Sequence, residues 1–199
     1  NGKVMMVTSF NPGSGKTFVA INLATCLAIK QKKVLVIDLD LRRATLSQYA
    51  KQVKPGISNY LAGQVLTIQD ITTDEEDRHS SLDIIPVGTI PPNPTELLAS
   101  ERLEQLLAQL RKEYDYILID CPPIEIVADA TIISKYVDAT LFVVRAGLLQ
   151  RNMLPQLNKL YNSHKYKSMT VLLNGTELVH GRRYGYQYGY NYGYGRYDK

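Results

Sequence analysis

The chain has 199 residues, 45% of them hydrophobic, so it can bury a full core, and its length suits one domain with an appendage. The net charge of +4 is mild and lies largely in the last twenty residues, so a basic nucleic-acid footprint over the whole surface is not indicated. Two cysteines, Cys26 and Cys121, lack disulfide or metal-ligand spacing, which favours a reducing compartment.

Short apolar runs of about five residues alternate with helical segments along the chain. Near-continuous apolar runs are typical of strands that are covered on both faces. The alternation predicts an α/β fold with a doubly wound, mostly parallel sheet, whose ligands bind beyond the carboxyl ends of the strands. The polar segment 72–81 is expected to be a solvated loop. The predicted strands are 4–8, 34–38, 82–87, 116–120, 140–144 and 170–174.

The turn NPGSGKT, residues 11–17, follows the first predicted strand and leads into an apolar helix. Such a turn aims successive backbone N–H groups at a phosphate, the helix start adds positive potential, and Lys16 supplies a mobile charge. The hydroxyl of Thr17 can bind Mg²⁺. The usual pattern is G-x-x-x-x-G-K-[ST], and this chain has Phe10 at the first glycine position, so the loop relies on Pro12 and Gly13.

Three aspartates end predicted strands, namely Asp38 and Asp40 in VLVIDLDLR and Asp120 in YILIDCPP. In a parallel sheet they would meet at the edge that holds the phosphate cradle. Mg²⁺ takes few protein ligands, so Thr17 and a nearby carboxylate are enough to hold it. A further carboxylate would be free to accept a proton from a hydroxyl group or from water.

A helix is predicted after NPTE. There Asn93 can cap, Pro94 takes the first helical position and Glu96 the third, for a reciprocal cap. Leucines then recur at helical spacing and predict one buried stripe. These leucines are Leu103, Leu106, Leu107 and Leu110.

Two arginines, Arg42 and Arg145, also lie near predicted carboxyl ends of strands. Either can contact phosphate or form a surface salt bridge, and the sequence leaves both open.

The end of the chain concentrates tyrosines in a glycine-spaced tail. Taken alone, this composition suits disorder, tyrosine phosphorylation or stacking on single-stranded nucleic acid. Seven of the 14 tyrosines lie here: Tyr184, Tyr186, Tyr188, Tyr190, Tyr192, Tyr194 and Tyr197.

The combination of NPGSGKT, VIDLDLR, LIDCPP and GTIPPNPTELL (88–98) resembles the bacterial tyrosine kinases, or BY-kinases, of capsule and exopolysaccharide export. The resemblance covers essentially the whole chain and implies a P-loop NTPase with Walker A, A′ and B motifs. It divides the chain into a kinase domain, 1–179, and a tyrosine-rich tail, 180–199. It implies ATP and Mg²⁺ as cofactors and metal ligation by Thr17, Asp38 and Asp120. The implied catalytic residues are Lys16, Asp38, Asp40 and Asp120. Asp38 is the preferred base.

The same resemblance implies a nucleotide site along the P-loop, and Asn174 at the position where related ATPases contact adenine. The tail tyrosines become the autophosphorylation targets, and phosphoryl transfer takes place between subunits. We therefore expect a homo-oligomer formed through tail-to-active-site contacts, a membrane activator domain in the same or a partner chain, and no nucleic acid. The expected nucleotide-binding residues are Asn11, Pro12, Gly13, Ser14, Gly15, Lys16, Thr17, Phe18 and Asn174.

No stretch approaches the roughly 20 apolar residues that span a bilayer, and no signal peptide is apparent. The chain begins at Asn1, after the point where family members carry an E-x-x-R-x-x-R helix that assembles a ring. We expect a domain of a longer protein, placed on the cytoplasmic side of the bacterial inner membrane, and the missing helix leaves its oligomeric state open.

The main alternative is a P-loop ATPase of the partitioning and positioning class, with a Tyr/Gly tail that binds nucleic acid or a partner. Those ATPases carry K-G-G-x-G-K-[ST], and here Asn11 and Pro12 replace the leading lysine and glycine. A GTPase is disfavoured because the segment NKLY, 158–161, has tyrosine where the guanine-reading aspartate belongs. ATP is therefore the expected nucleotide.

Overall fold

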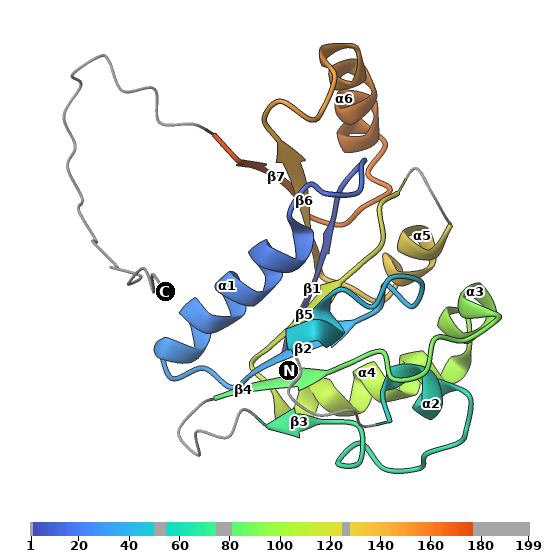
Figure 1. Ribbon diagram of the computed structural model, residues 1–199. Coiled ribbons are helices and arrows are strands. Elements are labelled where there is room, and N and C mark those ends of the chain that lie inside the picture. The colour runs from blue at the N-terminus through green and yellow to red at the C-terminus, as the bar shows by residue number, and fades with distance from the viewer. Residues whose placement is uncertain (1, 50–54, 75–80, 125–127, 177–199) are drawn as a thin grey trace, which may run out of the picture.

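The computed structural model describes residues 2–49, 55–74, 81–124 and 128–176. It contains a seven-stranded sheet in the order β3-β4-β2-β5-β1-β6-β7, in which only β3 runs antiparallel to its neighbour (Figure 1). The strands are β1 (Lys3–Thr8), β2 (Val34–Asp38), β3 (Thr73–Asp74), β4 (Leu82–Ile85), β5 (Tyr116–Asp120), β6 (Ala139–Arg145) and β7 (Met169–Asn174).

The six predicted strands are confirmed, and the mostly parallel, doubly wound fold with them. The expectation that 72–81 is a solvated loop was wrong at its start, because Thr73 and Asp74 form β3 beside β4. The Thr73 hydroxyl also donates to the Ile84 carbonyl (2.9 Å). A two-residue edge pairing carries no apolar period, so the sequence pattern gave no signal for it. Residues 75–80 lie outside the described residues.

Helices connect the parallel strands. The segment after NPTE forms two helices instead of one, separated at Ala99 and Ser100. Asn93 is the N-cap residue of the first helix and Pro94 its first residue, as predicted, but the expected reciprocal capping bonds are absent, because the Asn93 side chain donates to the Glu96 carboxylate instead (2.7 Å). The helices are α1 (Lys16–Ile29), α2 (Ile57–Leu61), α3 (Pro94–Leu98), α4 (Glu101–Glu113), α5 (Asp129–Ile133) and α6 (Leu154–Asn162), with 3₁₀ turns η1 (Leu46–Tyr49) and η2 (Arg151–Met153).

The two faces of the sheet are covered very differently. On one face the strands pack against α1, through residues such as Val19, Ala20 and Ala24. The larger core lies on the other face, under α2 to α6, and includes all four leucines of the predicted α4 stripe. Figure 1 shows α1 on one side of the sheet and α3, α4 and α5 on the other. Within the described residues, α1 is the single α-helix on its face, where Leu46 of η1 joins the same core cluster.

No helix within the described ranges is long and apolar enough to cross a membrane. The predicted boundary between domain and tail, at 179 and 180, and all seven tail tyrosines lie outside the described residues.

Candidate active site

The P-loop connects β1 to α1 and has a backbone that only glycine adopts readily. Gly13 and Gly15 have φ angles of 74° and 89°, in the left-handed region. Gly15 is the N-cap residue, and Lys16 opens the helix. Among the described residues, no amide of the segment 13–17 donates a backbone hydrogen bond. The loop therefore presents unsatisfied N–H groups at a helix start, as a phosphate site requires.

Side chains hold the P-loop carbonyls and so keep its amides available. The Asn11 carbonyl accepts from the Ser9 hydroxyl (2.7 Å) and the Ser14 hydroxyl (2.9 Å). From the far side, Arg145 donates to the Gly13 carbonyl (2.8 Å) and Asn174 to the Ser14 carbonyl (3.0 Å). The carboxyl ends of β6 and β7 thus brace the loop.

The three predicted aspartates do meet at one edge of the sheet. Asp38 and Asp120 are register partners on β2 and β5, and Val7, just before the P-loop, is the partner of Asp120 on β1. Asp40 lies two residues beyond Asp38, and all three carboxylates are buried. The strand order β2-β5-β1 is what brings them beside Lys16 and Thr17.

Asp38 is held by the backbone and by one hydroxyl. Its Oδ2 accepts from both the backbone N–H and the hydroxyl of Ser47 (3.1 Å each), and its Oδ1 accepts from the Asp40 N–H (3.2 Å). Burial, reinforced by the negative charge of Asp120, raises the pKa of Asp38 to about 7, although the Ser47 bonds oppose the shift. A carboxyl group with this pKa can take up a proton near neutral pH.

Asp120 combines one strong contact with one unsatisfied atom. Its Oδ2 accepts from the Thr17 hydroxyl (2.5 Å), whereas its Oδ1 is buried and has no hydrogen-bond partner within the described residues. Burial raises the pKa of Asp120 to about 6, against the Thr17 bond and the charge of Lys16. Burial also lowers the pKa of Lys16, which Asp120 and Asp40 partly offset.

The residues around Asp120 fit a divalent cation. The unpartnered Oδ1 of Asp120 and the Thr17 hydroxyl bonded to Oδ2 are the hard oxygen ligands that Mg²⁺ prefers. Within the described ranges, no group of three or more His, Cys, Asp or Glu side chains makes a complete metal cage. Mg²⁺ usually keeps several of its waters, so a site for it needs few protein ligands.

Two residues that sequence reasoning missed complete the surroundings. Ser47 bonds Asp38, and its hydroxyl also accepts from the Val87 N–H (2.9 Å). The buried Asp129 binds Arg42 (3.1 Å) and accepts from the Thr95 hydroxyl (2.8 Å). Of the two readings of Arg42, the structure shows the salt bridge. Neither Ser47 nor Asp129 stands in a recognisable motif, so only the packing of distant loops reveals them.

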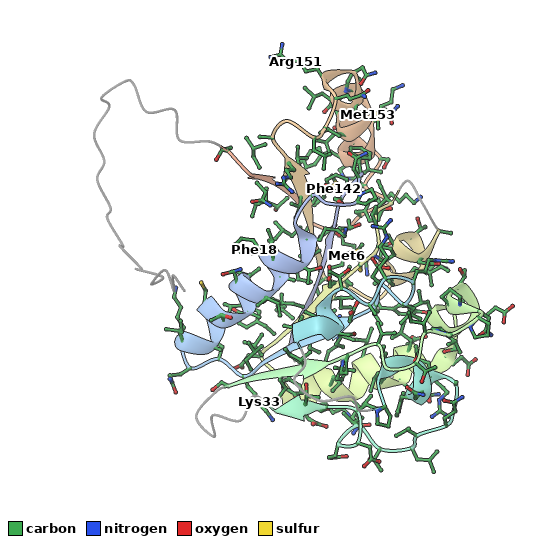
Figure 2. The ribbon with its side chains drawn as sticks, in the orientation of Figure 1. Met6, Phe18, Lys33, Phe142, Arg151 and Met153 are labelled. Carbon is green, nitrogen blue, oxygen red and sulfur yellow. The ribbon has the colours of Figure 1, made fainter. Side chains whose placement is uncertain are left out.

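The remaining predicted site residues are also placed. Asp40 accepts from the Arg43 N–H (3.2 Å). Pro12 lies in the P-loop, and Phe18 in the first turn of α1, where its side chain points outward and is 59% exposed (Figure 2). The Asn174 amide contacts the P-loop itself, and its contact with adenine stays a prediction.

Comparisons with known proteins agree with this geometry. The AAA domain family matches residues 2–159. Tyrosine-protein kinase YwqD of Bacillus subtilis is 35% identical over 185 residues, which cover 92% of this chain and 77% of that protein. The chain belongs to the bacterial tyrosine kinases. The kinase domain of Escherichia coli ETK superposes on this kinase with a TM-score of 0.80 at 33% identity, covering 94% of this chain and 72% of that one.

The family also contains much longer proteins. Tyrosine-protein kinase etk of Escherichia coli K12 is 38% identical over 146 residues, and this kinase spans only 20% of its length. The cell division ATPase MinD of Pyrococcus furiosus matches with a TM-score of 0.68 at 22% identity, covering 85% of this chain and 70% of that one. That likeness shows a shared fold and nothing about activity. The kinase is thus a P-loop protein-tyrosine kinase domain, built on the fold that the alternative ATPase class also uses.

Proposed function

We propose that this kinase is an ATP-dependent autokinase that transfers phosphate to the tyrosines of its own C-terminal tail. The observation that supports this most directly is the pair of buried carboxylates on neighbouring strands. Asp120 is bonded to Thr17 of the P-loop, whereas Asp38 is held by Ser47, away from it. This difference supports the proposal that Asp120 serves the metal side and that Asp38 serves the acceptor hydroxyl.

Positioning and charge neutralisation supply most of the rate in such transfers. The free amides of residues 13–17 and the ammonium of Lys16 would orient the ATP phosphates and compensate their charge. Thr17 and Asp120 would hold Mg²⁺, and Asp38, which the family resemblance also implies as a ligand, would instead stay free for the acceptor hydroxyl. The ion would supply additional charge neutralisation on the phosphates.

Proton transfer assigns a role to Asp38. A phenol with a pKa near 10 is protonated at pH 7. As the tyrosine oxygen bonds to the γ-phosphorus and the bond to the β-phosphate oxygen breaks, the phenolic proton passes to Asp38, and ADP leaves. The pKa of about 7 suits Asp38 to accept this proton and later release it to water.

The tail can reach an active site in its own or a neighbouring subunit. Because β7 ends at the sheet edge that holds the P-loop, the tail starts close to its own site. About 20 residues span roughly 60 Å when extended, which also permits transfer between chains. We propose transfer between subunits, as in the family. To test this, an inactive Lys16→Met chain that keeps its tail is mixed with an active chain that lacks tail tyrosines. Transfer between chains should label the Lys16→Met tail with phosphate, and an unlabelled tail would contradict it.

The proposed biological setting follows the family. We propose that the full protein lies at the cytoplasmic face of the inner membrane, responds to a membrane activator domain, and regulates polysaccharide polymerisation and export. Tail phosphorylation would alter its assembly, because seven phosphotyrosines add on the order of −10 to −14 charge to a tail that begins positive. Sizing before and after reaction with Mg·ATP tests this, and an assembly that full phosphorylation leaves unchanged contradicts it.

The deciding experiment is site-resolved mass spectrometry after incubation with Mg·ATP. We expect phosphate on the tail tyrosines of the wild-type chain and none in Lys16→Met, because methionine cannot neutralise the charge of the γ-phosphate. The circular dichroism spectrum of the variant should equal that of the wild type, which shows that the fold is intact. ADP release without phosphotyrosine would favour the ATPase alternative. Tail phosphorylation at the wild-type rate in Lys16→Met would contradict the assignment of the P-loop.

A further inference from the structure

The face of the sheet that carries α1 has an open groove between α1, β6 and β7. The groove has a volume of about 540 Å³. Its lining includes Phe18, Leu23 and Cys26 from α1, Leu141 from β6, and Thr170 and Leu172 from β7. No charged side chain is among the residues that line it. The volume lies within the range of about 300–1,000 Å³ that is typical of ligand pockets, so the groove has room for side chains of an occupant.

Two neighbouring features show that the groove is unfinished. After Lys16, α1 has no charged residue as far as Ile29, so its outer side is uncharged, with Asn22 and Thr25 beside exposed apolar residues such as Phe18. Within the described part of the chain, β7 pairs only with β6, and it ends the sheet. Val171 and Leu173 on this edge strand are 44% and 59% exposed, and their side chains lie on the face opposite the groove. An apolar edge strand of this kind is a template for one more strand.

The tail has the sequence pattern of the missing strand. From Tyr184 to Tyr194, every second residue is tyrosine, so an extended backbone places all these phenols on one face. Six such residues span about 20 Å, which matches the six residues of β7, and carry three phenols. These tail residues lie outside the described residues, and the pattern is read from the sequence alone.

Chain connectivity favours the tail of the same molecule as the occupant. Asn174, the last residue of β7, itself lines the groove. The nine residues 175–183 that follow are enough for the chain to reverse and run antiparallel to β7. Such a short tether gives the tail a millimolar effective concentration at the groove.

We propose that the unphosphorylated tail pairs with the free edge of its own β7 and lays three phenols in the α1–β7 groove. Tyrosine suits this surface, because its ring is apolar and its hydroxyl can stay at the wet rim. A phosphotyrosine does not suit it, because a dianion placed there would lose water and meet no cation. The groove would thus store the tail until it is phosphorylated, an arrangement distinct from the active site that modifies it.

Cys26 provides a direct readout, because it is exposed in the groove whereas the other cysteine, Cys121, is fully buried. The experiment measures the rate at which a thiol reagent labels Cys26 in phosphatase-treated full-length protein. A contact with millimolar effective concentration and a dissociation constant near 0.1 mM slows labelling about tenfold. Replacing the six tyrosines 184–194 by serine in the full chain should restore fast labelling. Equal rates in the two proteins would overturn the proposal.

A matched pair of variants on β7 locates the contact. Leu172→Lys places a charge in the groove and should speed Cys26 labelling to the rate of the serine variant. Leu173→Lys, one residue along and on the opposite face, should leave labelling slow. Similar rates in both variants would overturn the groove assignment. The serine variant changes no described residue, so the proposal stays testable even where Leu172→Lys unfolds.

Two further measurements define the occupant. Hydrogen exchange should show that β7 amides are protected and that this protection disappears in the serine variant. If the amides are protected but Cys26 is labelled fast, the tail pairs with β7 without placing its phenols in the groove, which would contradict the proposal. Slow labelling that is lost on dilution would assign the tail to a second copy and overturn the contact within one chain. The release of the tail from the groove on phosphorylation rests on the proposed autokinase function. Phosphorylated protein should label fast, and slow labelling of protein carrying phosphate would overturn it, whereas missing phosphate would contradict only the kinase proposal.

Discussion

Charged groups usually lie in water and apolar groups in the core, and the catalytic edge and the α1–β7 groove depart from this rule in opposite directions. At the edge, Lys16, Asp38 and Asp120 are charged groups taken out of water, and in the groove Phe18 is an apolar side chain left in it. Both cost stability, through desolvation of charge in one case and through exposed hydrocarbon in the other. By our proposals, this kinase keeps such unfavourable surface where a ligand is to cover it: phosphates at the edge and tyrosines in the groove.

The largest expected effect removes the base from the catalytic edge. Asp38→Asn keeps the shape of the side chain and removes its ability to accept the phenolic proton. We expect tail phosphorylation to slow by about 10²–10⁴-fold, measured with labelled ATP. Nucleotide binding should persist, because Lys16 and the P-loop amides are unchanged, and labelling of Cys26 should stay slow. A wild-type rate in this variant would contradict the role of Asp38.

The same substitution should change how stability depends on pH. The pKa of Asp38 in the folded state is about 7, compared with an ordinary value of 3.8. The folded protein therefore binds more protons than the unfolded chain between these values, and stability falls as pH rises from about 4 to 7. Asparagine has no charge to bury, so at pH 8 the substitution should raise the free energy of unfolding. The gain should be on the order of 2 kcal/mol, because the loss of hydrogen bonds to the carboxylate offsets part of it. Urea unfolding with a chelator at pH 5 and pH 8 checks this, and equal pH dependences would contradict it.

The two P-loop glycines offer a smaller and matched test of the catalytic edge. A Cβ at Gly13 meets nothing within 4 Å, whereas one at Gly15 lies 2.3 Å from the Asn174 amide nitrogen. Both alanine variants pay about 1–2 kcal/mol for a positive φ. Only Gly15→Ala should also displace Asn174 from the Ser14 carbonyl and weaken nucleotide binding further, measured by titration calorimetry. Equal losses in the two variants would mean that Asn174 does not brace the loop.

The smallest expected effect lies in the groove. Phe18→Ser removes a large side chain that is already 59% exposed, so the free energy of unfolding should change by less than about 0.5 kcal/mol. By contrast, Leu118→Ala, at a fully buried position under α1, should cost about 2–5 kcal/mol. Denaturant unfolding of both, with serine at all tail tyrosines, isolates the bare groove. A large loss in Phe18→Ser would show that the ring packs more tightly than its exposure indicates.

Local patterns predicted much of the fold and of the site. Apolar runs located six strands, and the leucine stripe located α4, because both are set by neighbours a few residues apart. The same patterns failed where the partner is distant or short. They missed β3, and they placed Asn93 correctly at the helix start but predicted capping bonds where its amide donates to the Glu96 carboxylate. They also missed Ser47, whose contact with Asp38 depends on how the η1 turn folds back over the strand ends.

By itself, the sequence determined the phosphate loop, the three aspartates that end strands and the family to which the chain belongs, because these are features of residue type and spacing. The tertiary structure decided that β5 lies between β2 and β1, which sets Asp38 opposite Asp120 and beside Thr17. It also decided how deeply these carboxylates are buried, and hence their raised pKa values, and it left one face of the sheet under a single described helix. The physical reason is that strand order and desolvation arise from contacts between distant segments, which no local period encodes.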